Sequence, residues 1–514
     1  MKEIVEQIFM DRITEVRVEY AKKRVEASNI YEAREAAADI SSAGKEVPSE
    51  ATVIVLTYNN QLEKTKRCCE SVLKYTTDVD YDLILIDNGS GPEMMEYFKT
   101  IEHPKKRIIH LHNNMGSAFP CEILSMNMLG EFVTILAFDL ILTKNWLSNL
   151  IKVFRSDPKI GLVNPVCSNT SNLQCVELQY SNYEEMQEKA AAFNISDPTK
   201  WQERLRIITL GYTLRKSCIY AIGWPVNDVG FMHNFMDDDL AFRVRRMGYK
   251  VVVAGDTWIC HDHIRTEKEL VKLREDLKRG RADFQQKYRG IDAWDDVNNF
   301  IFHSLGNKIK KVDTDSAKIL GIDVKCGTPI LDIKNVIRKY GIYDAELSAF
   351  TTDEKYVEDL RTICNGIVAC DREEFIPRRF LYAYYDYIIM DKPLNAYHEP
   401  MNVLMDAFML LKPGGQLIFT LKNTNNAITL LKMLGYGIPS ENEYYYNYPI
   451  DALMKDMQEM GNKVSVLMLE HLQNIDKSVV NMANEMLKTY CRPEMLEEMS
   501  RRMMLDRIWL SMEK

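Results

Sequence analysis

Residues 236–263 place three consecutive carboxylates, a basic helix, a β-branched strand and two histidines in one short run, MDDDLAFRVRRMGYKVVVAGDTWICHDH. Neighbouring carboxylates repel one another, and proteins tolerate such a cluster where it binds cations or takes up protons. The run therefore indicates a reactive site in which carboxylates bind a cation or act as a base. The structural alternative is that the three acids form the first turn of a helix, where negative charge is favourable.

Two further acids stand where an apolar segment ends. Asp87 lies near the end of YDLILIDNGS (81–90), whose glycine permits a tight turn. Asp139 directly follows the apolar residues 132–138, where a carboxylate can ligate a Mn2+ or Mg2+ ion that bridges two phosphates. Gly116, in the turn NNMGSA, allows a ligand to approach the backbone closely. A plain turn or a helix cap is the alternative for each.

The elements that position these residues form a regular pattern. From residue 51 to about 165, short apolar segments alternate with helical ones, which predicts a mostly parallel sheet with its ligands at the carboxyl ends of the strands. The predicted strands are 53–60, 81–90, 107–114 and 132–139.

The chain has 514 residues, more than one core usually serves, so several domains are expected. A second α/β pattern begins at KILGIDVKCGTPI (318–330) and continues through YYDYIIMD and LLKPGGQLIFTLKN. The fold class predicted is α/β. The expected division is a helical N-terminal extension (1–48), a first α/β domain (50–300), a second α/β domain (310–450) and a helical C-terminal segment (451–514).

Composition excludes some function classes. The net charge of −9 argues against a nucleic-acid-binding protein, and no segment approaches the roughly 18 consecutive apolar residues of a membrane helix. The 11 cysteines are an odd number without a C-x-x-C pair, and they indicate reduced thiols. We expect a cytoplasmic protein, either free or docked on the inner face of the membrane, with homo-oligomerisation left open.

In their order, these motifs resemble family 2 nucleotide-sugar glycosyltransferases. The acidic run resembles the family's E-D-x-D-L-x-x-R with Met236 in place of the glutamate, and residues 135–147 resemble L-x-x-D-x-x-x-x-x-x-W-L. The resemblance implies a GT-A (Rossmann-like) fold in the first domain. It also implies an inverting reaction, in which a base deprotonates the acceptor hydroxyl as that hydroxyl attacks the sugar. Asp237 is the expected catalytic base, with Asp238 as the fallback.

The same resemblance implies the remaining site residues. Asp87 would accept a hydrogen bond from a uracil or thymine base, with Thr57, Asn59 and Gly116 bordering the nucleotide. Asp139 and His261 would bind the divalent metal (Mn2+ or Mg2+), although Ala137 stands where the family often has another aspartate. Strict metal dependence is therefore left open.

The function implied is transfer of a sugar from a UDP- or dTDP-sugar to a hydroxyl of a surface polysaccharide, glycolipid or glycoprotein. The enzyme would be of the hexosyl- or N-acetylhexosaminyltransferase type. Its partners would be the nucleotide-sugar donor and the glycan, lipid or protein acceptor, without nucleic acid and without a transmembrane segment.

The second α/β pattern resembles class I S-adenosylmethionine-dependent methyltransferases at LLKPGGQLIFTLKN. It departs from their glycine-rich loop at Lys325 and Pro329, and Phe350 stands where an acid is expected. We therefore expect that S-adenosylmethionine binding has been lost and that this domain serves assembly or acceptor recognition. The alternative is a bifunctional glycosyltransferase and methyltransferase acting on one glycan, which would have to use Asp323 and Asp371.

Overall fold

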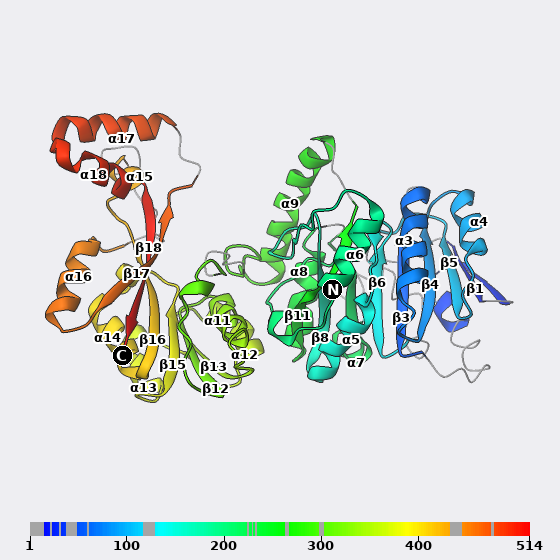
Figure 1. Ribbon diagram of the computed structural model, residues 1–514, viewed down its shortest axis with the longest axis horizontal. Helices are drawn as coiled ribbons and strands as arrows, with labels where there is room; N and C mark the ends of the chain where they lie inside the picture. Colours follow the sequence, from blue (N-terminus) through cyan, green and yellow to red (C-terminus); the bar gives the residue numbers. More distant parts are fainter. Residues whose placement is uncertain are drawn as a thin grey trace. The chain divides into compact units, whose positions relative to one another are not determined.

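The computed structural model divides into two units, residues Met1–Asn298 and Asn299–Lys514, and each is described by itself (Figure 1). The structure describes residues 15–20, 23–29, 32–36, 49–58, 61–116, 129–223, 226–228, 230–231, 234–262, 267–297, 303–431, 445–473 and 477–514.

The described part of the first unit is built on an 11-stranded sheet of order β2-β1-β5-β4-β3-β6-β10-β8-β11-β7, with β9 paired to β11. Strands β5, β4, β3 and β6 run parallel, as do β8 and β11, whereas β1, β10, β7 and β9 run antiparallel to their neighbours. The strands are β1 (Val16–Tyr20), β2 (Lys23–Ala27), β3 (Ala51–Thr57), β4 (Tyr81–Asn88), β5 (Lys106–Leu111), β6 (Phe132–Ala137), β7 (Leu140–Ile141), β8 (Ile160–Cys167), β9 (Trp201–Glu203), β10 (Tyr212–Arg215) and β11 (Lys250–His261).

The central strands are buried on both faces, which is why they read as continuous apolar runs. Along β4, Ile84 belongs to one core cluster and Leu85 to the other, because successive side chains point to opposite faces of a sheet. The helices of this unit are α3 (Leu62–Tyr75), α4 (Pro92–Thr100), α5 (Trp146–Ser156), α6 (Tyr183–Phe193), α7 (Lys216–Ile222), α8 (Met236–Arg246) and α9 (Glu267–Lys287). The predicted α/β class is thus confirmed.

The prediction of a helical N-terminal extension is wrong for residues 16–20 and 23–27. These residues form β1 and β2, which pair antiparallel as a hairpin, and β1 also pairs antiparallel with β5. Val16 and Val18 are buried while Arg17 between them is partly exposed, a period of two that a strand satisfies and a helix does not. Residues 32–36 are helical, and the rest of the predicted extension lies outside the described residues.

The second unit holds a seven-stranded sheet of order β14-β13-β12-β15-β16-β18-β17 in its described residues. All neighbours from β14 to β16 are parallel, and β18 runs antiparallel between β16 and β17. This is the methyltransferase-like Rossmann arrangement that was expected. The strands are β12 (Ser316–Ile322), β13 (Asp344–Thr351), β14 (Val368–Cys370), β15 (Tyr385–Met390), β16 (Leu411–Lys422), β17 (Val464–His471) and β18 (Leu505–Glu513).

The prediction of an all-helical segment at 451–514 is also wrong in part. Strands β17 and β18 complete the sheet: the backbone of β18 pairs with β16 on one side and β17 on the other, and most side chains of β18 are buried. The helices of this unit are α11 (Thr328–Arg338), α12 (Val357–Ile363), α13 (Ile376–Arg379), α14 (Pro400–Leu410), α15 (Ala427–Leu431), α16 (Ile450–Glu459), α17 (Lys477–Tyr490) and α18 (Leu496–Met503).

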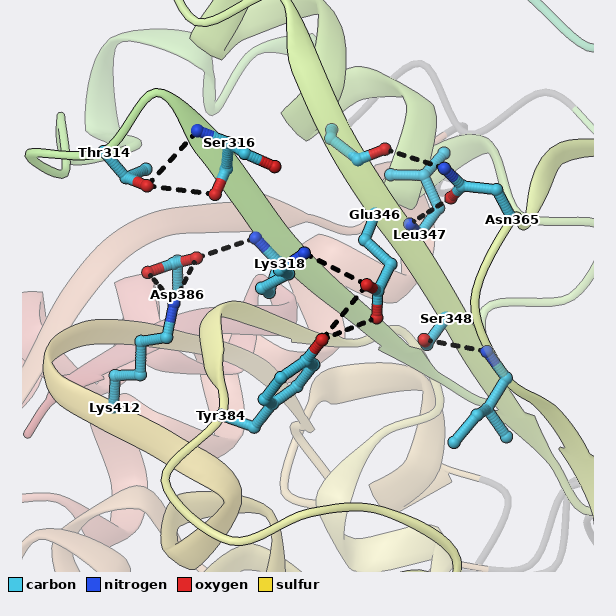
Figure 2. A network of polar contacts seen from close by, with 12 residues as sticks. Thr314, Ser316, Lys318, Glu346, Leu347, Ser348, Asn365, Tyr384, Asp386 and Lys412 are labelled. Atoms are coloured by element: carbon cyan, nitrogen blue, oxygen red, sulfur yellow. Dashed lines mark hydrogen bonds and ion pairs between the residues drawn. The ribbon is translucent and has the colours of Figure 1, made fainter.

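A polar network joins the strands of the second sheet near their amino ends (Figure 2). Lys318 Nζ lies 3.0 Å from Glu346 Oε2, and the Tyr384 hydroxyl donates to the same carboxylate at 3.0 Å. Asp386 accepts from the Lys318 backbone N–H at 2.7 Å and from Lys412 Nζ at 3.0 Å. The two positive and two negative charges balance within the network, so we assign it to strand alignment rather than to ligand binding.

Candidate functional site

The carboxyl ends of β3, β4 and β5 bring three polar side chains into one row. Thr57 is the register partner of Asp87, and Asp87 is the partner of His110. Thr57 Oγ1 shares a hydrogen bond of 2.8 Å with Thr65 of α3. The Asp87 carboxylate is fully buried, with Oδ2 2.7 Å from His110 Nδ1 and Oδ1 accepting from the Ser90 N–H at 2.9 Å. Both oxygens of Asp87 are therefore already held by the protein.

Asn88 holds the expected nucleotide-binding turn against the end of β4. Its Oδ1 accepts from the Met115 N–H at 2.8 Å and its Nδ2 donates to the Gly116 carbonyl at 2.9 Å. Gly116 has a φ of +77°, a conformation that favours glycine. A Cβ on Gly89 would lie 2.4 Å from the Asn114 backbone nitrogen, so the two turns touch directly.

Two parts of the expected nucleotide pocket cannot be located. Asn59, and the helix expected to start after Gly116, lie outside the described residues.

Asp139 and His261 meet because β7 pairs with the end of β11. His261 is the register partner of Leu140, which follows Asp139, and the Asp262 N–H donates to the Asp139 carbonyl at 2.9 Å. His261 Nε2 then lies 3.6 Å from Asp139 Oδ2. Both side chains are about nine-tenths buried, with 9% and 10% of their surface exposed.

The orientation of His261 fits a metal ligand. Its Nδ1 lies 3.0 Å from the Asn169 carbonyl oxygen, which can only accept, so the hydrogen of this pair is on Nδ1. In the neutral ring Nε2 then carries a lone pair that faces the Asp139 carboxylate across 3.6 Å, a separation that a divalent cation can bridge. No group of three or more His, Cys, Asp or Glu forms a metal site among the described residues. A cation here would have two protein ligands, and the phosphates of a ligand would supply others.

The acidic triplet opens α8, and the structure separates its members. The buried Asp238 forms an ion pair with Arg206, whose Nη2 donates to Oδ2 at 3.1 Å. The buried Asp239 pairs with Arg243 at 2.8 Å and with Lys287, and it accepts from the hydroxyl of Tyr288 at 2.6 Å. These hydrogen bonds tie the helix to α9 and to the segment before β10. Asp238 and Asp239 therefore have structural partners of their own.

Asp237 differs from its neighbours. Among the described residues it takes part in no ion pair, and its side chain is half-buried. Burial raises the pKa of Asp237 to about 7, with a further contribution from the adjacent Asp238 and an opposing one from Arg206. A carboxylate whose pKa lies near neutrality is suited to take up a proton from a substrate.

The segment 168–175 lies between Arg206, which pairs with Asp238 of α8, and the residues Asp139 and His261. Asn169 supplies the carbonyl that holds His261, and Asn172 Nδ2 donates to the Arg206 carbonyl at 3.2 Å. Sequence reasoning missed Arg206, His110 and these two asparagines, because each acts on a residue that is distant in the sequence. Only His110 could have been found from the sequence, because it lies near the carboxyl end of a predicted strand, as Asp87 does.

The cofactor loop of the second unit does not fit S-adenosylmethionine. Lys325 adopts a φ of +53°, and a Cβ on Gly327 would lie 2.4 Å from Ile363 Cδ1. The space beside Gly327 is therefore filled by the side chain of Ile363 rather than left for a ligand. Asp323 Oδ1 accepts from the Thr352 N–H at 2.6 Å, which joins the ends of β12 and β13, and burial raises the pKa of Asp323. Asp371 forms an exposed ion pair with Arg379. Phe350 is fully buried.

No helix in the described residues is long and apolar enough to cross a membrane.

Comparison with solved structures finds glycosyltransferases for the first half of the fold and methyltransferases for the second. GalNAc-T7 with UDP, GalNAc and Mn2+ is 14% identical, with a TM-score of 0.34 over 43% of this chain and 45% of that one. The mannosyltransferase PcManGT of Pyrobaculum calidifontis, with GDP-Man and Mn2+, is 15% identical, with a TM-score of 0.33 over 45% and 61%. This chain thus spans about half of their lengths.

An S-adenosylmethionine-dependent methyltransferase from Archaeoglobus fulgidus is 14% identical, with a TM-score of 0.30 over 45% of this chain and 98% of that one. No curated protein sequence matches the chain. Residues 52–202 match the family model described as glycosyl transferase family 2, and these residues are accordingly a glycosyltransferase domain of that family.

Proposed function

We propose that the first unit transfers a hexosyl or N-acetylhexosaminyl group from a UDP- or dTDP-sugar to a hydroxyl of a surface polysaccharide, glycolipid or glycoprotein, with inversion. The observation that carries this proposal is the separation of roles within the acidic triplet. Asp238 and Asp239 are held in ion pairs, and Asp237 is left with a pKa of about 7 at the start of α8.

Asp237 would act as the base. It would take the proton from the acceptor hydroxyl as the hydroxyl oxygen bonds to the anomeric carbon, and the bond from that carbon to the nucleotide phosphate would break on the opposite face. One displacement of this kind inverts the configuration. The proton ends on Asp237, and the bonding electrons leave with the nucleotide.

Asp139 and His261 are the residues that would hold a Mn2+ or Mg2+ ion. When bound, the ion would neutralise the charge that develops on the departing diphosphate. Thr57, Asn59 and the turn around Gly116 would border the nucleotide.

Asp87 is buried with both oxygens engaged, so we assign it an indirect part. It would order the Ser90 turn and His110 rather than accept a hydrogen bond directly from the nucleobase.

For the second unit we propose a role in assembly or acceptor recognition rather than in methyl transfer. The positions of Lys325 and Gly327 support this, because backbone must approach the cofactor at those positions. Titration of the full-length protein with millimolar S-adenosylmethionine should give no binding heat. Stoichiometric binding would favour the bifunctional alternative instead.

The test of the transferase proposal is Asp237→Asn, assayed with a panel of UDP- and dTDP-sugars and Mn2+. We expect turnover, measured as release of the nucleotide, to be lost, while calorimetric binding of UDP is retained because the variant keeps the donor pocket. Asp157→Asn is the matched control, because Asp157 pairs with Lys250 at the amino end of β11. Turnover that survives in Asp237→Asn would move the base elsewhere.

A further inference from the structure

Of the two adjacent carboxylates Asp237 and Asp238 at the start of α8, only Asp238 pairs, within the described residues, with a buried cation, Arg206. Arg206, in the segment between β9 and β10, is 9% exposed, and Asp238 is 1% exposed. The guanidinium reaches both oxygens of Asp238, since Nε pairs with Oδ1 and Nη2 donates to Oδ2 at 3.1 Å. One hydrogen bond and one close ion-pair contact therefore hold the Asp238 carboxylate against the guanidinium group. Asp238 is thereby neutralised, whereas Asp237 beside it forms no ion pair with the described residues.

The other charges close to this turn cancel one another. Asp239, on the same helix, is paired with Arg243 and with Lys287 from α9, and Lys287 also contacts Asp228 at 2.5 Å. Within the part of the chain that the structure describes, the charges that act on Asp237 are those of Asp238 and Arg206, with opposite signs. The balance between these two charges decides whether Asp237 is ionised at neutral pH.

We infer that Arg206 is a positioning residue for the proposed base, because it neutralises Asp238 and so leaves Asp237 as the single reactive carboxylate of the triplet. This inference rests on the proposed function. Arg206 does not touch the reacting atoms and acts through Asp238. Its backbone carbonyl accepts from Asn172, so the same residue also joins the base region to the segment that holds His261.

Substitutions of the two partners should shift the acid limb of the pH profile, where activity rises as Asp237 ionises, in opposite directions. Arg206→Met removes the cation and keeps a similar side-chain stem, so Asp237 should ionise only at higher pH. Asp238→Asn removes the neighbouring negative charge, so Asp237 should ionise at lower pH. A charge 4–6 Å away moves a carboxyl pKa by about one unit or more, and each single variant should show a shift of about that size.

The experiment uses full-length protein at saturating Mn2+ and the UDP- or dTDP-sugar that the wild type turns over, with nucleotide release followed from pH 5 to 9. The double variant Arg206→Met/Asp238→Asn should return the acid limb towards its wild-type position, because both charges are gone. Arg206→Lys keeps a positive charge and should leave the limb near its wild-type position. If Arg206→Met does not fold, the two single variants Arg206→Lys and Asp238→Asn still test the inference, because only Asp238→Asn should shift the acid limb.

An acid limb that stays in place in both Arg206→Met and Asp238→Asn, with only thermal stability lowered, would reduce Arg206 to a structural residue. A limb that moves in the same direction in both variants would also overturn the inference. A wild-type protein that turns over no nucleotide sugar at any pH would overturn the proposed function itself. The failure of the inference and the failure of the function are therefore distinguishable.

Discussion

Replacement of Asp239 by asparagine tests whether the acidic triplet is divided as described. Asp239 is fully buried and contacts Arg243 Nε at 2.8 Å, the Tyr288 hydroxyl at 2.6 Å and the Lys287 ammonium group. Asparagine keeps the shape of the side chain but removes the charge. The perturbation therefore leaves two cations at the junction of α8 and α9 without their shared counterion.

The magnitude follows from the burial of these partners. Removing one member of a buried ion pair costs about 3–5 kcal/mol. Lys287 is 34% exposed and keeps its contact with Asp228, so the lower end, about 3 kcal/mol, applies here. A unit of this size loses about 2–4 °C of midpoint per kcal/mol, which corresponds to a fall of about 6–12 °C.

The assay is differential scanning calorimetry of the full-length protein, combined with turnover measured well below the lowered midpoint. Tyr288→Phe serves as the graded control, because it removes one hydrogen bond to the same carboxylate and should cost about 1.5–3 kcal/mol. A variant Asp239→Asn that keeps its midpoint but loses turnover would refute the reasoning. Asp239, and not Asp237, would then carry the chemistry.

Three further outcomes are expected. Because the pKa of Asp237 is raised to about 7 in the folded protein, its contribution to stability is full below about pH 4 and is lost as the pH rises through 7. Asp237→Asn should therefore raise the thermal midpoint at pH 8, with a gain that shrinks towards pH 4, and a gain that is constant with pH would contradict the assigned burial. His261→Ala should weaken Mn2+-dependent UDP binding by roughly tenfold or more in calorimetry, whereas UDP binding in EDTA should stay unchanged. Gly89→Ala should destabilise the protein by about 1–3 kcal/mol in urea denaturation and weaken UDP binding, because its Cβ would meet the Asn114 backbone nitrogen at a φ of +75°; an unchanged midpoint would show that this turn can shift.

The central strands of the first unit could be predicted from the sequence because they are buried on both faces. Each reads as an unbroken apolar run that only a strand of a covered sheet explains. The hairpin β1–β2 and strands β17 and β18 could not be predicted in the same way. They lie at or near the outer part of their sheets, where the alternation is short and charged residues allow a helical pattern as well.

The sequence predicted which residue types lie at the strand ends of the candidate site, but it did not predict the role of each residue. The triplet offered three equivalent acids, and the difference between them is set by Arg206 and Lys287, which lie more than 30 residues away on either side. The burial of Asp87 likewise depends on His110 from the neighbouring strand. Sequence spacing contains no information on such contacts, since they arise only when the sheet is assembled.

The β1–β2 hairpin has a practical consequence for anyone who cuts this protein at its family boundary. The glycosyltransferase match begins at residue 52, so a fragment that starts there would lack both strands. The backbone N–H and C=O groups of β5 that β1 now satisfies would become an open sheet edge. Such a fragment is expected to aggregate and to form inclusion bodies, even if it extends past His261 and so keeps every candidate site residue.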